Sequence, residues 1–556
     1  MFYKSKVRTT LGLGAVVAAS ALVLGACAGG GTGGGDSAGP APAEQEGVGS
    51  GYLVDYSVYG DAYANTITVT DVPGPCSYEE ISKKDYSGQT LRILAHVPPN
   101  MGEPANLHAE QFADLTGVNI EINNVSFGDL FAEQQRTFQT GVNAYDVIFG
   151  GSHWLGDFAQ YYATVPDFYL NETELAKTTE LYQQIAQWNG ETKLYKIDGD
   201  RHYMKYRTDV YDDPEAQAAY LAATGNELDV PQTWTEYNSH AAFFAELAAS
   251  GAWTPTNQPA GIDFYGSVEI MARDNLMFSA FISRVAPYAK HPDVTGGFWF
   301  DENMVPQVNN PGFVAGLTDF VEAVSFVPPG YSAFGLAEEI ESFGKGEGLL
   351  SYTWDDAYVE ANQPTNQIRT SIAAAPLPGA NEVWNRDTGQ WETLSSGINF
   401  APYISWGWTS AVTEASPVKQ LAFDYLCFFG NQANRTIDLT IGRFGVNPSR
   451  TDEFDINFWT GDIGWEQRAA ETFIGVLENY EANTNRVFDL RVPGNGELYA
   501  AMSNGVAEAL AGQKSPQQAL DEVAAEWNAI VERIGVDTVR DAYQSTIALE
   551  DNLLGF

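Results

Sequence analysis

The strongest constraint on the fold is an alternation of short apolar runs with helical stretches between residues 91 and 151. The runs at 91–97, 118–125 and 145–149 have the apolar, β-rich character of strands. The segments 105–116 and 127–140 between them have helical spacing, and each is closed by a glycine. This β-α-β-α-β order predicts a mostly parallel sheet covered by helices, and in such α/β folds ligands bind at the carboxyl ends of the strands.

Composition narrows the class of protein further. The chain has 556 residues, 44% of them hydrophobic, and a formal net charge of −43. This apolar content excludes wholesale disorder, and the length indicates two or three domains. An acidic excess of this size argues against nucleic acid as a partner, because phosphate binding needs a basic face. The acids are spread along the chain, so we interpret the charge as a solubility trait.

The N-terminus has the layout of a bacterial secretory signal. Lys4, Lys6 and Arg8 precede an apolar run at 11–24, which is too short to span a bilayer comfortably. The run ends in the sequence Leu-Gly-Ala-Cys, which resembles a lipobox whose cysteine, Cys27, becomes lipidated. The alternative is an ordinary signal with a chance cysteine.

The segments that follow predict a tethered globular protein. Residues 1–26 form the expected signal peptide, and residues 27–50, rich in Gly, Ala, Pro and Ser, read as a flexible tether. Residues 51–90 read as a small irregular or β extension. We therefore expect the protein on the extracellular face of the cell membrane. Cys76 and Cys427 could pair there, but a buried free thiol at Cys427 is an equal alternative.

Eight short motifs in fixed order carry a resemblance to a known family. They lie at 108–118, 145–159, 198–210, 231–234 (Pro-Gln-Thr-Trp), 346–356, 376–379 (Pro-Leu-Pro-Gly), 405–419 and 511–527. Together they resemble the extracellular solute-binding proteins of ABC importers, in the maltose-binding-protein-like branch that mostly handles sugars. The resemblance covers residues 91 to about 535.

The resemblance implies two discontinuous α/β lobes joined by hinge strands around a ligand cleft. Carried onto this chain, the first lobe is 91–200 with 376–440, and the second is 201–375 with 441–545. Residues 546–556 then form a C-terminal tail. The implied partners are a small carbohydrate and a membrane permease, and we expect a monomer.

A sugar site needs aromatic rings for the C–H face and acids or amides for the hydroxyl rim, on loops at strand ends and lobe crossings. The residues in such places are Asn100, Ser152, His153, Trp154, Asp198, Asp200, Asp355, Trp406 and Trp408. The resemblance adds Trp354, which stands where the family has a cleft-facing aromatic, and Tyr499, which stands where maltose-type relatives have a stacking aromatic. With 13 Trp and 28 Tyr in the chain, core packing is the competing interpretation for every aromatic. An alternative for Trp408 is that its side chain points into the sheet. An alternative for Asp198 and Asp200 is that they form a turn around Gly199.

The sequence contains no recognisable arrangement of catalytic residues. The six histidines lack zinc-ligand spacing, the only dinucleotide-type glycine pattern lies in the tether, and no P-loop or serine elbow is present. We therefore predict no catalytic residue, metal or cofactor. The alternatives are a surface glycoside hydrolase using paired acids such as Asp355 and Asp356, or a binding lipoprotein that senses a polyol or cationic solute without transport.

Overall fold

The structure, a computed structural model, describes residues 71–294, 296–404 and 407–553. The signal peptide, Cys27, the tether and Trp406 lie outside the described residues. Within them, no helix is both long and apolar enough to cross a membrane.

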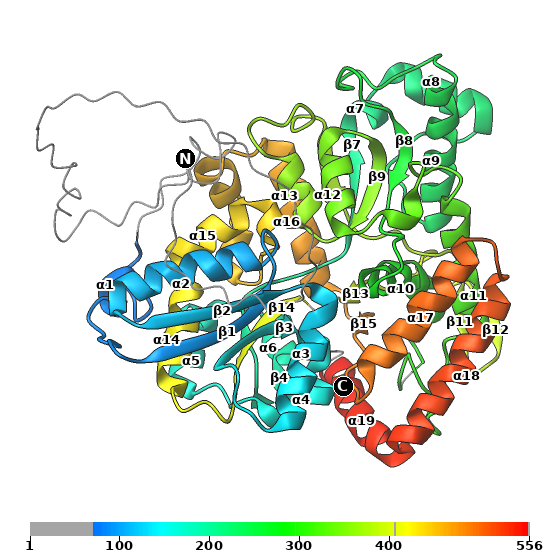
Figure 1. Cartoon of the computed structure of the whole chain (residues 1–556). Helices are drawn as coiled ribbons and strands as arrows, with labels where there is room; N and C mark the ends of the chain where they lie inside the picture. Colours follow the sequence, from blue (N-terminus) through cyan, green and yellow to red (C-terminus); the bar gives the residue numbers. More distant parts are fainter. Residues whose placement is uncertain (1–70, 295, 405–406, 554–556) are drawn as a thin grey trace, which may run out of the picture.

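The first and larger of the two main sheets of the described residues has five strands in the order β2-β1-β3-β14-β6 (Figure 1), and three two-stranded sheets accompany them. Their bounds are β2 (Asn119–Val125), β1 (Thr90–His96), β3 (Val147–Gly151), β14 (Trp408–Val412) and β6 (Tyr195–Lys196). β1 pairs in parallel with β2 and β3, whereas β14 runs antiparallel to β3 and β6. The predicted parallel β-α-β-α-β unit is confirmed.

Two helices connect the parallel strands of this sheet. They are α2 (Gly102–Thr116) and α3 (Phe127–Thr140). Ser126 caps α3 by accepting a hydrogen bond from the Asp129 N–H, and Gly141 ends it in a left-handed conformation. Local capping signals therefore place the boundaries of α3 where the sequence predicted them.

The N-terminal part of the described chain is fastened to the first sheet's helices. Cys76 and Cys427 form a disulfide, which resolves the alternatives left open by the sequence. The short helix α1 (Tyr78–Ile81) packs against α2 and α14 (Lys419–Phe429). Within residues 71–89 the chain is irregular apart from the four residues of α1, so the expected irregular extension carries one short helix and, over these residues, no strand.

The second sheet has four strands in the order β10-β7-β9-β8. Their bounds are β10 (Ile372–Ala375), β7 (Tyr203–Arg207), β9 (Gly348–Thr353) and β8 (Tyr265–Val268). β7 is antiparallel to both of its neighbours, and β8 is parallel to β9. We call each sheet with its packed helices a lobe, the first lobe holding β1 and the second holding β7.

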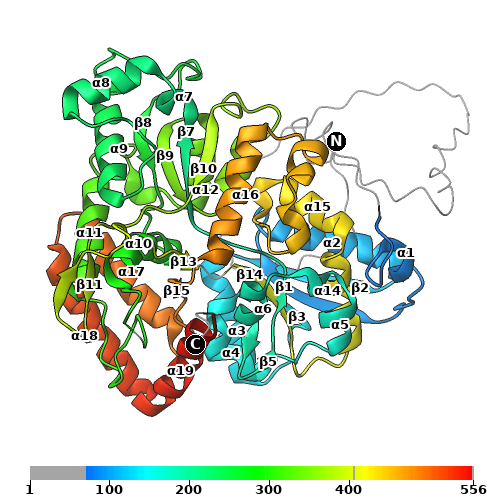
Figure 2. The ribbon, with the colours of Figure 1, turned by 180° about the vertical axis from the view of Figure 1, so that it is seen from behind.

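Helices cover the second sheet and extend beyond it (Figure 2). α9 (Trp234–Ala249) packs on β8 and begins at a capping box formed by Thr233 and Glu236. α16 (Gln467–Ala482) packs on β10, although nearly one hundred residues separate them. Apart from α7 and α8, whose bounds are given below, the other helices of this half are α10 (Asn275–Ala289), α11 (Pro311–Ala323), α12 (Leu336–Lys345), α13 (Asp356–Ala361), α17 (Asn495–Leu510), α18 (Pro516–Ile534) and α19 (Val536–Leu553).

The chain passes between the two lobes more than once. It leaves the first sheet after β6, enters the second at β7, and returns from β10 to β14. It continues through α14, α15 (Gln432–Thr440) and the 3-10 turn η6 (Gly442–Phe444) before α16 reaches the second lobe. Both lobes are therefore discontinuous, as the fold class predicted; their residue boundaries stay a prediction. The boundary expected between 545 and 546 falls inside α19, whose buried Val539, Tyr543 and Thr546 pack on one side.

The other elements are short. They are η2 (Ser152–Trp154), α4 (Leu155–Phe158), η3 (Ala159–Tyr161), α5 (Asp167–Glu172), η4 (Glu174–Lys177), α6 (Glu180–Ile185), β4 (Gln187–Trp188), β5 (Glu191–Thr192), α7 (Thr208–Tyr211), α8 (Pro214–Thr224), η5 (Tyr331–Ala333), β11 (Val383–Asn385), β12 (Gln390–Glu392), β13 (Tyr403–Ile404), η7 (Thr451–Phe454), η8 (Phe458–Asp462) and β15 (Val487–Phe488).

Candidate ligand-binding site

A cavity of about 800 Å³ lies between the two lobes. The first lobe lines it with residues 96–100 at the end of β1, with Phe127 and with Trp408, and the second lobe lines it with residues from α12, α13 and the start of α10. Cavities that enclose small solutes typically measure roughly 300–1,000 Å³. The space therefore has the size and the two-sided walls of a small-molecule site.

Aromatic rings form the wall on the first lobe. Trp408 is the first residue of β14, and its ring lies 5.4 Å from the His96 ring and 5.6 Å, edge to face, from Phe127. Gly407 precedes it with φ +57°, and a Cβ there would lie 2.6 Å from Lys196 Nζ. The left-handed φ is what favours glycine at this position. The Trp408 side chain lines the cavity, so it does not only pack into the sheet.

Trp354 provides an aromatic group from the second lobe. It follows β9 directly and precedes α13, so the end of a strand places it at the cavity. Its ring packs edge to face on His202, with the centroids 4.3 Å apart, and only 2% of the residue is exposed. This packing fixes the orientation of the indole.

Two buried carboxyl groups lie at the floor of the cavity. The Asn447 side-chain amide donates to Asp200 Oδ1 at 2.6 Å and to Asp356 Oδ2 at 3.4 Å. Burial, together with the nearby charges of Asp198 and Asp356, raises the pKa of Asp200 well above its usual range. Burial and the charge of Asp198 raise the pKa of Asp356 to about 7. Burial lowers the pKa of Lys196, which lies beside Asp200, to about 8.

Asp198 has a structural role at the lobe crossing and does not line the cavity. Its Oδ1 accepts from the N–H groups of Gly199 and Asn447, both at 2.7 Å, and its Oδ2 accepts from the Trp408 N–H at 2.8 Å. The carboxylate is fully buried. It therefore connects three chain segments at the hinge, which differs from the ligand contact expected of it.

Four other expected site residues lie in the core beside the cavity instead of lining it. Trp154 packs on Phe127 and Phe131, with centroids 5.7 and 5.6 Å away. His153 stacks on Tyr499 at 5.5 Å, and burial lowers the His153 pKa to about 3. Ser152 is buried with them. These residues are held by packing partners distant in sequence, which spacing along the chain does not reveal.

The structure thus brings four of the expected residues to the cavity: Asn100, Asp200, Trp354 and Trp408. Asp355 is fully buried behind the wall, and its neighbour Asp356 takes the lining position. Trp406 lies outside the described residues.

Sequence reasoning missed several lining residues. They are His96, Phe127, Asp274, Glu338, Glu341, Asp356, Glu360 and Arg443. His96 is the last residue of β1, and Phe127 follows β2 at the start of α3. Since ligands bind at the carboxyl ends of parallel strands, the sequence could have indicated both residues. Asp274 and Glu338 each accept a hydrogen bond from an N–H group at the start of a helix.

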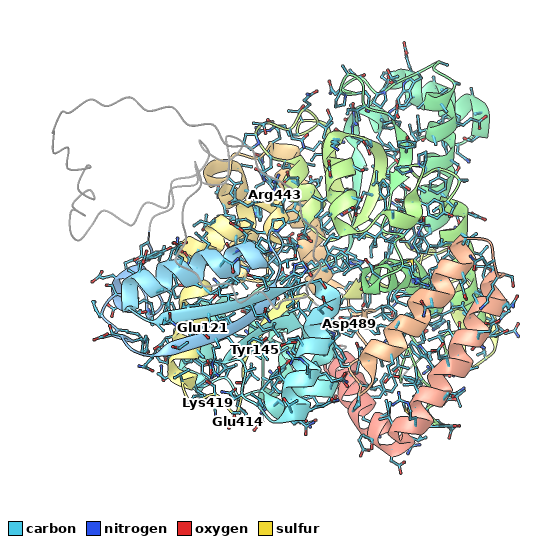
Figure 3. The ribbon with its side chains drawn as sticks, in the orientation of Figure 1. Glu121, Tyr145, Glu414, Lys419, Arg443 and Asp489 are labelled. Carbon is cyan, nitrogen blue, oxygen red and sulfur yellow. A yellow bond between two sulfur atoms is a disulfide. The ribbon has the colours of Figure 1, made fainter. Side chains whose placement is uncertain are left out.

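Arg443 and Glu360 form an ion pair at the cavity edge. Arg443 Nη2 donates to Glu360 Oε1 at 2.9 Å, joining η6 to α13. Figure 3 shows Arg443 beside α13 and α15, where the two lobes meet. The histidines, cysteines and acids of the described ranges form no group of three or more that could hold a metal ion.

Comparison with known proteins agrees with this architecture. No protein-family model matches the chain. A curated relative, the probable amino-acid ABC transporter periplasmic-binding protein y4oP of Sinorhizobium fredii, is 23% identical over 336 residues, which are 58% of this chain and 69% of that protein.

Solved structures of the same shape cover most of the chain. Maltose-bound MalE3 of T. maritima has a TM-score of 0.61 and 18% identity, covering 79% of this chain and 99% of its own. An ABC transporter solute-binding protein of Agrobacterium radiobacter K84, in complex with ribitol, has a TM-score of 0.61 and 20% identity, covering 80% and 100%. A third, from Agrobacterium vitis S4 with bound D-mannitol, has a TM-score of 0.61 and 14% identity, covering 81% and 99%.

The chain therefore has the fold of the solute-binding proteins of ABC transporters, with two α/β lobes around a cavity. The resemblance to that family and the predicted fold class are confirmed. Among the similar structures are proteins described with a bound sugar or polyol.

Proposed function

We propose that the protein is the substrate-binding component of an ABC transporter, which captures a carbohydrate, a sugar or a polyol, in the cavity between its lobes and delivers it to a membrane permease. The observation that carries the proposal is the interlobe cavity, with Trp354 from one lobe and Trp408 from the other. Aromatic rings stack on the C–H faces of a sugar, and carboxylates accept hydrogen bonds from its hydroxyl groups.

In this proposal, binding of the solute is coupled to closure of the two lobes. A solute that contacts Trp408 on the first lobe and Trp354 on the second gains its full set of contacts only when the lobes are close together. It therefore shifts the population toward the closed arrangement, which the permease would recognise. The hinge held by Asp198 is the place where the segments that cross between the lobes are joined.

The proposal includes an extracellular, membrane-anchored monomer without a catalytic role. Its support is the signal-like N-terminus and Cys27 in its lipobox-like context, followed by the Gly-rich tether. At roughly 5–6 Å × √n, a tether of this length would hold the lobes some 25 Å from the anchor.

A thermal-shift panel with a blocked cavity tests the proposal. Ala337 is an exposed residue of α12 that lines the cavity, so Ala337→Trp fills the space without disturbing the core. Ala223 is an exposed residue of α8 away from the cavity, so Ala223→Trp is the matched control.

The panel contains maltose, glucose, ribitol, mannitol, glucosamine and spermidine. At least one solute should raise the melting temperature of the wild type and of the Ala223→Trp variant, because a ligand that binds the folded state stabilises it. The shift should be lost in the Ala337→Trp variant. A panel without any shift, or shifts that survive Ala337→Trp, would refute a solute site in this cavity.

A further inference from the structure

The lining of the interlobe cavity carries far more negative than positive groups. Its acids are Asp200, Asp274, Glu338, Glu341, Asp356 and Glu360, and the one Lys or Arg among its described lining residues is Arg443. Arg443 is paired with Glu360, and Glu341 is paired with Lys345 on the solvent side of α12. Lys196 lies against Asp200 from behind. The ion pairs within the described part of the chain leave Asp274, Glu338 and Asp356 without a cationic partner.

Asp356 is the innermost of these three carboxyl groups. It is only 2% exposed, and its Oδ2 receives the long hydrogen bond from Asn447. Its Oδ1 is buried and accepts no hydrogen bond from any side chain or backbone group of the described residues. A buried carboxylate oxygen in this situation costs free energy unless a donor or positive charge satisfies it. Since Asp356 lines the cavity, that donor can come from the solute.

Asp274 and Glu338 form a second negative pair at the mouth of the cavity. Each uses one oxygen at a helix start: Asp274 Oδ1 accepts from the N–H groups of Leu276 and Met277, and Glu338 Oε2 accepts from the Gly335 N–H. A Cβ on Gly335 would lie 3.3 Å from Glu338 Oε2 and 3.8 Å from Asp274 Oδ2. The two carboxylates therefore approach each other over the same glycine.

We propose that the solute taken by this cavity carries a protonated amine, which Asp356 binds at the floor or the Asp274–Glu338 pair binds at the mouth. The proposal rests on the proposed binding function and specifies its substrate class. An ammonium group supplies three hydrogen-bond donors and a positive charge, whereas a hydroxyl group supplies one donor and no charge. Trp354 and Trp408 also line the cavity, and indole rings attract cations, which is compatible with the same kind of ligand.

Two further observations agree with an ammonium group. Burial and the negative charge of Asp198 raise the pKa of Asp356 to about 7. A bound ammonium would replace the proton that this environment favours. A metal ion is a poorer fit, since the acids of the described residues do not converge in a group of three or more.

Calorimetric titration of the full chain with matched sugars tests the charge directly. Glucosamine, glucose and N-acetylglucosamine share one ring and differ at C2, which carries a charged ammonium group in the first, a hydroxyl group in the second and a neutral acetamide in the third. Spermidine carries the same ammonium chemistry without a sugar ring. We expect glucosamine or spermidine to bind at least tenfold more tightly than either neutral sugar, with an affinity that falls as sodium chloride rises from about 50 to 500 mM.

Charge-neutralising variants locate the contact. Asp356→Asn removes the inner charge, and Asp274→Asn removes an outer charge while it keeps a residue that caps helices equally well. Asp387→Asn, at an exposed acid away from the cavity, is the control. We expect at least one of the two cavity variants to weaken binding of the amine at least fivefold, and Asp387→Asn to leave it unchanged.

The outcomes separate this inference from the proposed function. If glucose or N-acetylglucosamine binds as tightly as glucosamine, or if neither amine binds while a neutral sugar or polyol does, the inference is overturned and the solute-binding function stands. If amine binding survives both cavity variants, the inference is also overturned. If no solute binds and Ala337→Trp changes nothing, the proposed function itself fails. If spermidine binds tightly and glucosamine does not, the inferred amine recognition is supported and the solute is a polyamine.

Discussion

Asn447 donates a hydrogen bond from its side-chain amide to the Asp200 carboxylate at a distance of 2.6 Å. The two residues are separated by 247 positions in the sequence and belong to different passages of the chain between the lobes. The backbone N–H of Asn447 donates in addition to Asp198 at 2.7 Å. The hinge and the floor of the cavity are therefore built from the same contacts, so the position of the site acids depends on the integrity of the crossing.

The Asp198→Asn variant tests the hinge. An amide has one acceptor oxygen where the carboxylate has two, so either the Trp408 N–H or the pair from Gly199 and Asn447 would face an NH₂ group. We expect the free energy of unfolding, measured by urea denaturation, to fall by about 2–4 kcal/mol. The exposed Asp387→Asn control should change it by less than about 0.5 kcal/mol. Equal stability of the Asp198→Asn variant and the control would contradict the structural role of Asp198.

The Trp354→Ala variant tests the aromatic wall of the second lobe. Loss of an indole that stacks on a solute should weaken binding at least tenfold, which corresponds to about 1.4 kcal/mol. The measurement is calorimetric titration with the panel solute that stabilises the wild type most. Trp391→Ala, at a half-exposed tryptophan of β12, controls for loss of an indole elsewhere. An affinity that Trp354→Ala leaves unchanged would remove Trp354 from the site.

The disulfide is predicted to stabilise the first lobe. Cys76–Cys427 closes a loop over 351 positions and fixes the segment of α1 to α14. Loss of such a bond typically costs about 2–4 kcal/mol. We expect dithiothreitol to lower the melting temperature of the wild type and to have no effect on a Cys76→Ser, Cys427→Ser double variant, which should already melt at the lower temperature. A wild type that is insensitive to the reductant would argue against the disulfide's contribution.

Asp489 makes stability depend on pH. It is buried near β15 (Figure 3), and its Oδ1 accepts hydrogen bonds from the hydroxyl groups of Tyr403 and, at 2.9 Å, Tyr499. Burial raises its pKa to about 7, above the value near 4 of an unfolded chain. Between about pH 4 and pH 7 the folded state therefore holds a proton that the unfolded state releases, and stability falls as the pH rises through this window.

The Asp489→Asn variant isolates this contribution. Asparagine keeps an oxygen for the two tyrosines and cannot ionise, so its free energy of unfolding should fall less between about pH 4 and pH 8 than that of the wild type. The difference should be at most about 4 kcal/mol, about 1.4 kcal/mol for each unit of the shift. Parallel pH profiles of the variant and the wild type would show that Asp489 does not titrate in this way.

The sequence predicted the first lobe well because its signals are local. Apolar runs and caps such as Ser126 and Gly141 act within a few residues, so β1, β2, α2 and α3 followed from periodicity. Asn100 followed from the rule that ligands lie at strand ends, and Trp354 from its position in one of the motifs that carry the family resemblance.

The rest of the site depends on contacts that are distant in sequence. Asp198 and Asp200 flank one glycine, and only the fold shows that the first accepts backbone N–H groups while the second faces the cavity. His153 and Tyr499 stack on each other across more than three hundred residues. Asp274 reaches the cavity because the lobes face each other, which no local pattern encodes.

A crystal structure of the protein grown with the panel solute that stabilises it most tests the central claim most directly. The account predicts electron density for that solute inside the interlobe cavity, in contact with Trp354 from one lobe and with Trp408 or His96 from the other. Density for the solute at another surface, with the interlobe cavity unchanged, would contradict the account.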